Sequence, residues 1–409
     1  MLSSYPREVS STDEQFLEEL ERTTFEFFLA CTEPSTGLLK DRNHVKGDDP
    51  RGICSISATG FGLTALCIAD SRRWLNRGEA RERARTALRF IATRLPQEHG
   101  FFYHFVDWRS GERLWKCELS SIDTALLLAG VLTCRSWFSG DREIRRLTSQ
   151  IYDRVEWDWM LNGERTLSMG WKPESGFLTS RWNKYCELMI LYLLAIGSNR
   201  HPIAADSWHA WQRPTVEYKG YKFLSDGAPL FVHQFSHAWI DFRGQRDAYA
   251  DYFENSVIAT KAHRQFCIDL KSEFPSYGDD VWGITASDSV RGYVGWGGPP
   301  RSGHLDGTIV PCAAAGSLVF LPRETLDCLR TLRSRFGNRC WNRFGFVDAF
   351  NPLTGWTGPD IVGIDAGITL LMAENLRTGF VWRYFMKNPE VKRAMRLAGF
   401  QPSHSVKRP

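Results

Sequence analysis

The 409-residue sequence lacks the short signatures of several protein classes. It has no CxxC pair, no Asn-x-Ser/Thr acceptor, no GxSxG elbow and no GK[ST] phosphate loop. Its ten cysteines are scattered, and several lie in apolar stretches, so we expect reduced thiols that pack as small hydrophobic side chains. Lysine and arginine number 51 against 47 acidic residues, a net charge of only +4, and no basic tract is dense enough to bind nucleic acid.

Export and membrane signals are also missing from the sequence. Residues 1–15 contain no basic segment followed by an apolar one, so we expect no secretory signal peptide. The longest apolar runs, residues 125–132 and 188–196, are too short to cross a bilayer. We therefore expect a cytoplasmic protein without a membrane partner, or a periplasmic one if a native leader was removed. The sequence does not indicate an oligomeric state.

Aromatic residues, by contrast, are abundant: 16 Trp, 12 Tyr and 26 Phe make up 13% of the chain. Because a buried tryptophan needs a partner for its indole N–H, we expect some of these rings to line a wet site. Segments with helical periodicity dominate, and about twelve helices can be read. Short links between them alternate with long loops rich in glycine and aromatics, at residues 100–115, 167–177, 217–227, 277–307 and 344–359.

This alternation predicts an all-α toroid with long aromatic-rich loops on one face, where binding sites tend to lie. The sequence shows no internal repeat of 33–47 residues, so a toroid is favoured over an α-solenoid. Length alone suggests two to three domains, at about 150 residues each. Because no proline-rich or charged linker divides the chain, we predict one domain over residues 1–409, with a core at about residues 12–400.

Four acidic residues stand at the starts of predicted helices. Glu118 and Asp123 are five residues apart, about 140° around a helix, so they need not share a face. Asp360 and Asp365 precede the last predicted helix, residues 364–377, where Asp365 is a plausible N-cap. For each acid taken alone, capping of a helix N-terminus is a sufficient explanation.

Glu187 is a stronger candidate for a reacting group. We predict a helix over residues 181–196 with Ser180 as its N-cap, so that Glu187 lies beyond the first turn and runs into an apolar segment. Burial there would raise the pKa of its carboxyl, which suits a general acid. Pairing with Lys184 or Arg181 on a solvated face explains the spacing equally well.

Rings and carboxylates also occur together on the predicted loops. Tyr277, Asp280 and Trp282 lie in a glycine-flanked segment, and such groups can stack sugar rings and bind their hydroxyls. Further tryptophans in or beside the long loops are Trp108, Trp115, Trp171, Trp182, Trp296 and Trp356.

His233 and His237 have the i, i+4 spacing of a helical zinc pair. The glutamate of HExxH is missing and no third ligand is evident. A hydrogen-bonding or core role is therefore favoured over metal binding, and we expect neither a metal nor a cofactor.

Several blocks of the sequence resemble the glucoamylase-like, or glycoamylase, domain family. They are residues 60–66, 118–130, 168–177, 232–243, 251–255, 345–351 and 363–367, in the family's order over roughly residues 12–400. The resemblance implies an (α/α)6 barrel. The family includes bacterial endo-β-1,2-glucanases and the related module of cyclic β-1,2-glucan synthases. One departure is His304-Leu-Asp306-Gly-Thr, where the family more usually has Asp-Asp-Gly-Thr, so one subsite can differ.

Carried over by motif, Glu187 matches the family's candidate acid, and Asp123 and Glu118 match acids of the second block. The resemblance thus implies a glycoside hydrolase or transglycosylase of β-linked glucan, in the first place β-1,2-glucan. Glu187 would donate the proton, with Asp123 or Glu118 as the partner carboxylate. A non-catalytic glycan-binding protein and a polysaccharide lyase stay open as alternatives. Residues expected to bind the oligosaccharide or polysaccharide are Arg42, Trp115, Trp171, Lys172, Trp182, His233, His237, Tyr277, Asp280, Trp282, Asp306, Asp360 and Asp365.

Overall fold

The computed structural model describes residues 10–403. Residues 1–9 and 404–409 lie outside this range. Most of the segment without a signal-peptide pattern, residues 1–15, and both ends of the predicted domain therefore lie outside the described residues. Across residues 10–403, every helix is too short or too polar to cross a membrane.

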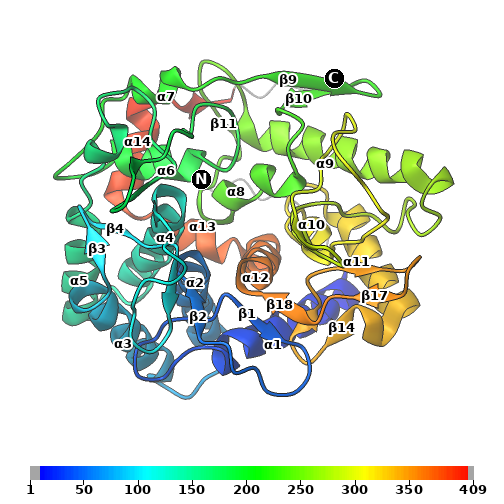
Figure 1. Ribbon diagram of the computed structural model, residues 1–409, viewed down its shortest axis with the longest axis horizontal. Helices are drawn as coiled ribbons and strands as arrows, with labels where there is room; N and C mark the ends of the chain where they lie inside the picture. Colours follow the sequence, from blue (N-terminus) through cyan, green and yellow to red (C-terminus); the bar gives the residue numbers. More distant parts are fainter. Residues whose placement is uncertain (1–9, 404–409) are drawn as a thin grey trace.

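Helices make up most of the regular structure, and the strands that join them are short (Figure 1). The helices are α1 (Ser11–Ala30), α2 (Ile56–Arg72), α3 (Glu79–Thr93), α4 (Ser121–Trp137), α5 (Arg142–Asp153), α6 (Met189–Ile196), α7 (Ser207–Ala210), α8 (Phe235–Trp239), α9 (Tyr252–Asp269), α10 (Pro311–Ala315), α11 (Pro322–Phe336), α12 (Gly363–Thr378), α13 (Phe380–Phe385) and α14 (Pro389–Leu397). The strands are β1 (Arg42–His44), β2 (Ile53–Ser55), β3 (Gln97–Glu98), β4 (Phe101–Phe102), β5 (Phe105–Asp107), β6 (Leu119–Ser120), β7 (Gly170–Lys172), β8 (Gly176–Phe177), β9 (Thr215–Tyr218), β10 (Tyr221–Leu224), β11 (Gln245–Arg246), β12 (Ser287–Ser289), β13 (Gly292–Val294), β14 (Trp341–Asn342), β15 (Gly345–Phe346), β16 (Phe350–Asn351), β17 (Trp356–Thr357), β18 (Asp360–Val362) and β19 (Gln401–Pro402).

Buried and half-exposed helices alternate along the chain. Helices α2, α4, α6, α8, α10 and α12 are buried over most or all of their length. Helices α1, α3, α5, α9 and α11 bury one face and expose the other, and they lie nearer the periphery in Figure 1. Because an amphipathic helix buries only its apolar stripe, the pattern indicates an inner layer covered by an outer one.

The long connections all precede inner helices, and short antiparallel pairs tie them together. Strand β1 pairs with β18, β2 with β5, and β6 with β7. These pairs join the segments that precede α2, α4, α6 and α12. The loops before these inner helices therefore gather at the N-terminal ends of the helices, on one face of the molecule.

Helices α2 and α4 approach so closely that two glycines form the contact. A Cβ on Gly60 would lie 2.2 Å from the carbonyl oxygen of Leu126, and one on Gly130 would lie 2.1 Å from that of Gly60. The sulfurs of Cys67 and Cys134 lie 3.6 Å apart across the same pair of helices. All ten cysteines are free thiols.

Two helix boundaries differ from the sequence prediction. Helix α6 begins at Met189 rather than near residue 181, and Leu188, not Ser180, is its N-cap. Residues 181–187 are irregular because their amides bond to other loops: that of Trp182 donates to Leu167, and that of Tyr185 to Gln212.

The helix expected to be the last is α12, but α13 and α14 follow it. Val362 is its N-cap, so Asp365 is its third residue rather than its cap.

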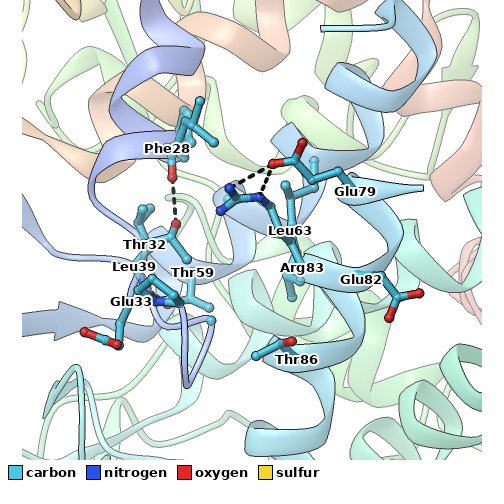
Figure 2. A pocket seen from close by; sticks show the side chains of 15 residues that line it. Phe28, Thr32, Glu33, Leu39, Thr59, Leu63, Glu79, Glu82, Arg83 and Thr86 are labelled. Atoms are coloured by element: carbon cyan, nitrogen blue, oxygen red, sulfur yellow. Dashed lines mark hydrogen bonds and ion pairs between the residues drawn. The ribbon is translucent and has the colours of Figure 1, made fainter. Parts of the chain in front are cut away.

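A cavity of about 300 Å³ lies among α1, α2 and α3 (Figure 2). Apolar side chains such as Phe28 and Leu63 line it, together with the Glu79–Arg83 ion pair. It lies between the outer helices α1 and α3 and the inner helix α2, and none of the acids at the starts of the inner helices lines it. The candidate site is therefore at the loop face, not here.

Candidate active site

Titratable side chains stand at the N-terminal ends of four inner helices. Asp123 and Asp365 are the third residues of α4 and α12, and Cys312 is the second residue of α10. Glu187 lies in the turn just before α6. The chain direction thus brings these groups to the same face as the long loops, where the positive ends of the helix dipoles favour carboxylates.

The Glu187 side chain is half-buried, and desolvation of its carboxyl by the surrounding protein raises its pKa to about 7. The nearby Asp123 raises it further, whereas a hydrogen bond from the Cys186 thiol opposes the shift. The Ser236 hydroxyl fixes the backbone by donating to the Glu187 carbonyl at 2.7 Å and accepting from the Ile190 amide at 3.0 Å. Glu187 is thus a carboxylic acid that keeps its proton close to neutral pH.

The alternative of a surface ion pair for Glu187 is wrong. Lys184 pairs with Asp226 at 2.8 Å, and the Arg181 guanidinium donates to the Leu161 carbonyl at 2.7 Å. Both cations are held elsewhere by loops that the sequence spacing could not place.

Asp123 and Glu118 meet through a third residue, His104. Its Nδ1 lies 3.0 Å from the Glu118 carboxylate, and its Nε2 lies 3.5 Å from Asp123. Ser120, and not Asp123, is the N-cap of α4, and its hydroxyl donates to the Asp123 carboxylate at 2.6 Å. The hydrogen bond from His104 lowers the pKa of Glu118, which makes Glu118 an ionised group rather than a proton donor.

A second acid group lies at α12, separated from the first by α2, which packs against both α4 and α12. Burial raises the pKa of Asp365 to about 6. Burial also raises the pKa of Asp348 well above its ordinary value, and the charge of Asp365 adds to this shift. The amide of Asp288 donates to Asp348 at 2.8 Å, and the Cys312 thiol lies against Asp365. Two buried carboxyls in contact cannot both ionise easily, so this pair shares a proton.

Arg42 lies at the edge of this second group. Its guanidinium binds Asp288 at 2.7 Å and Asp41 at 2.9 Å. Arg42 thus lies beside the acids of this group, and its role in substrate binding stays a prediction.

Asp360, in contrast, is fully engaged by Arg51, which binds it through two hydrogen bonds of 2.9 and 2.6 Å. His44, Asp49 and Asp360 are close enough to hold a metal ion, with candidate ligand atoms within 4.8 Å of one another. The Arg51 guanidinium also binds Asp49, and it supplies the positive charge that a cation would. This cluster therefore stabilises the loop between β1 and β2 and does not offer Asp360 to a ligand.

Five of the expected substrate-binding residues are buried, which corrects the expectation that they contact a ligand. The Trp182 indole donates to the Ser121 hydroxyl at 2.8 Å, and Tyr277 donates to the Thr308 carbonyl at 2.5 Å. The others are Trp282, His233 and His237, none more than 1% exposed. Trp182, Tyr277 and Trp282 belong to the main hydrophobic core of the protein.

The two buried histidines have no charge to offer. His233 lies 3.1 Å from the Tyr185 hydroxyl, and His237 lies 3.1 Å from the Ser256 hydroxyl. Burial lowers the pKa of each to about 3, so both imidazoles are neutral.

The remaining expected residues do lie on the loops. Trp115 is 66% exposed. Trp171 and Lys172 are half-buried on β7, which pairs with β6, the strand that directly follows Glu118. Asp280 is exposed, and Asp306 is half-buried and accepts a hydrogen bond from the Thr308 amide at 2.9 Å.

Three residues of the site were missed in the sequence: His104, Asp288 and Asp348. Asp348 lies within the family block at residues 345–351, which could have pointed to it. His104 and Asp288 stand in segments without a distinctive pattern.

Comparison with known proteins finds relatives named as enzymes that cleave β-1,2-linked glucans. An exo-β-1,2-glucooligosaccharide sophorohydrolase (non-reducing end) of Parabacteroides distasonis is 27% identical over 97% of this chain. The chain spans only 58% of that protein's length. Among solved structures, an endo-β-1,2-glucanase from Chitinophaga pinensis, in complex with sophorotriose and glucose, is 27% identical with a TM-score of 0.87; the match covers 95% of this chain and 98% of that one.

A putative glucoamylase from Bacteroides uniformis is 28% identical with a TM-score of 0.89, over 97% of this chain and 99% of that one. The model of the glycoamylase family, described as putative glucoamylase, matches residues 179–389, just over half of the chain and including Glu187, Asp348 and Asp365. With this match added to the helical fold and the acids on its loop face, the chain belongs to the glycoamylase family.

Proposed function

We propose that residues 10–403 form one (α/α)6 barrel. The alternation of six buried helices with amphipathic ones supports this arrangement, since an inner ring has no solvent-exposed side. One hydrophobic cluster extends from Phe16 on α1 to Ala398 after α14, which supports a single domain.

We further propose that the protein hydrolyses or transglycosylates β-1,2-glucan. The observation that carries this proposal is Glu187, a half-buried carboxyl before α6 whose pKa is raised to about 7 by desolvation and by the charge of Asp123. The names of the two β-1,2-glucan-cleaving relatives supply the linkage. Exo and endo action both occur among those relatives, so the proposal covers the linkage and not the mode of attack.

In this reaction Glu187 donates its proton to the glycosidic oxygen as the bond to the anomeric carbon breaks. A water molecule or a second sugar hydroxyl attacks that carbon and gives its proton to a carboxylate. Asp123 is our choice for that carboxylate, because it is the acid whose charge acts on Glu187. The Asp348–Asp365 pair, at the N-terminal end of α12, is the second choice.

The charge of the site argues against a polysaccharide lyase. A lyase needs cations that are free to bind the carboxylate of a uronate. The cations of this face are held by acids instead: Arg42 binds Asp41 and Asp288, and His104 lies between Glu118 and Asp123. Such a face suits a neutral glucan better than an anionic one. A purely glycan-binding protein would not need a carboxyl held protonated at neutral pH.

The proposal is tested by incubating the protein with linear β-1,2-glucan and separating the products by chromatography. We expect short β-1,2-linked oligosaccharides. A folded protein that releases no product from this or from β-1,3-, β-1,4- and β-1,6-glucans would contradict the proposal. Binding by calorimetry without turnover would favour the glycan-binding alternative.

Trp115 is the proposed stacking surface at one edge of the site. It holds a left-handed backbone conformation (φ 55°), as does Lys116 (φ 49°), and its ring contacts Phe105 with centroids 5.2 Å apart. Non-glycine residues rarely adopt this conformation, and it persists here with an exposed ring. We therefore place a glucose unit on this ring.

The Trp115→Ala variant is expected to raise KM for β-1,2-glucan about tenfold and to leave kcat within about twofold, because stacking contributes about 1–2 kcal/mol to binding. Initial rates over a range of glucan concentrations measure this. Trp115→Phe, which keeps a ring, should retain most of the affinity. An unchanged KM in the alanine variant would remove Trp115 from the binding surface.

A further inference from the structure

His104 lies between two carboxylates at the centre of the loop face. Its Nδ1 is 3.0 Å from Glu118 and its Nε2 is 3.5 Å from Asp123. The ring stacks on Phe105, with centroids 3.8 Å apart and planes 17° apart. Its amide donates to the Glu118 carbonyl at 3.0 Å, and its carbonyl accepts from the Ile56 amide at 3.2 Å. Both the backbone and the ring are thus fixed in one orientation.

The charged groups that face this imidazole are acidic. Glu118 and Asp123 come from the start of α4, and Asp41 comes from the segment before α2. Lys172 on β7 acts on Glu118 from its other side, and Glu187 lies beyond Asp123. Although burial alone would lower it, Asp123 and the hydrogen bond to Glu118 raise the pKa of His104 to about 9. The ring is therefore an imidazolium at neutral pH.

We propose that His104 is a positioning residue for the glucan-cleaving reaction: its ring contacts Glu118 and Asp123 at the same time and holds both carboxyl groups in fixed positions beside Glu187. This inference rests on the proposed function. Without the cation, nothing would offset the repulsion between two carboxylates that converge on one point, and the pKa of Glu118, which His104 lowers, would rise. The acid limb of the activity would then lie at higher pH.

The first test compares His104→Asn with His99→Asn. Asparagine can still donate a hydrogen bond to Glu118 but carries no charge. His99 is a matched control, because its Nδ1 pairs with Glu156 at 2.7 Å on the same loop, away from the acids. The left-handed conformation of His99 (φ 51°) also tolerates asparagine.

The measurement is the pH profile of kcat/KM on β-1,2-glucan. We expect the acid limb of His104→Asn to move to higher pH by about one unit, so that activity on the acid side falls about tenfold more than at the optimum. His99→Asn should keep the profile of the unmodified protein. An acid limb that does not move in His104→Asn, even with a lower rate, would overturn the proposal, since a structural role lowers the rate at every pH.

A second test needs no substrate and therefore separates this inference from the proposed function. The imidazole signals are followed by NMR against pH in the unmodified protein and in Glu118→Gln, which keeps the His104 ring and removes one of its acidic partners. We expect one histidine to titrate at about 9 and to move down by about one unit in the variant. If no histidine titrates above its ordinary value of about 6.5, or none responds to Glu118→Gln, the imidazolium is absent and the proposal fails.

Discussion

Replacing Glu187 by glutamine is expected to lower kcat on β-1,2-glucan by about 10²–10⁴-fold and to change KM little. Glutamine has nearly the same shape and can still donate a hydrogen bond to the glycosidic oxygen. It cannot transfer a proton, so the leaving group must depart as an alkoxide. Initial rates of product release, followed by chromatography, measure the loss.

The pH dependence gives the same prediction a second readout. Desolvation raises the pKa of Glu187 to about 7, so its carboxyl is protonated below that pH and ionised above it. The basic limb of the kcat profile should therefore lie at about 7 and fall about tenfold per unit above it. In Glu187→Gln this limb should disappear, because the group that titrates is gone.

Glu174→Gln is the matched control for this substitution. Glu174 lies on the same face and forms an exposed ion pair with Arg113 at 2.7 Å, so its loss should leave kcat unchanged. Full activity in Glu187→Gln would show that Glu187 is not the donor. The Asp348–Asp365 pair, whose carboxyls also have raised pKa values, would then be the next candidate.

The second large effect concerns stability. We expect Gly60→Ala to reduce the free energy of unfolding by about 3 kcal/mol, at the upper end of the cost of overpacking a core. The new methyl group would lie 2.2 Å from the Leu126 carbonyl oxygen, which belongs to the backbone of α4. Helix α4 cannot shift freely, because it also packs against α5 and α6. Thermal and urea denaturation followed by circular dichroism measure the loss.

Gly62, one half-turn along the same helix, provides the control. A Cβ there meets its nearest atom, on Leu39, at 3.5 Å, an ordinary contact. Alanine is also the better helix former by about 0.5–1 kcal/mol, so Gly62→Ala should be neutral or stabilising. If Gly60→Ala were as stable as Gly62→Ala, the close backbone contact between α2 and α4 would be wrong.

The large number of aromatic residues was only partly explained by a wet site. Five tryptophans, Trp157, Trp208, Trp211, Trp239 and Trp282, are among the largest fully buried side chains. Trp115 and a few others lie on the loops. The space between two layers of helices is wide, and large rings fill it, so composition alone could not separate packing rings from binding ones.

Local pattern in the sequence predicted most of the long helices and singled out the acid before α6, but it missed α13 and α14. The apolar run at residues 188–196 predicted a buried helix, and α6 is buried at every residue. The same pattern placed the helix start too early, because hydrogen bonds to residues 167 and 212 hold residues 182 and 185 outside the helix. Those partners are distant in the chain, so no window of sequence contains them.

What the sequence determined by itself is the helical character of the chain, the alternation of short links with long loops rich in glycine and aromatics, and the presence of acids near the starts of helices. These follow from periodicity and from glycine and aromatic content, which act over a few residues. Only the tertiary structure decided the protonation of the site. Glu187 keeps a proton because its carboxyl is desolvated near Asp123, and Glu118 loses one because His104 lies beside it. Desolvation and charge depend on neighbours in space, and the fold alone supplies those neighbours.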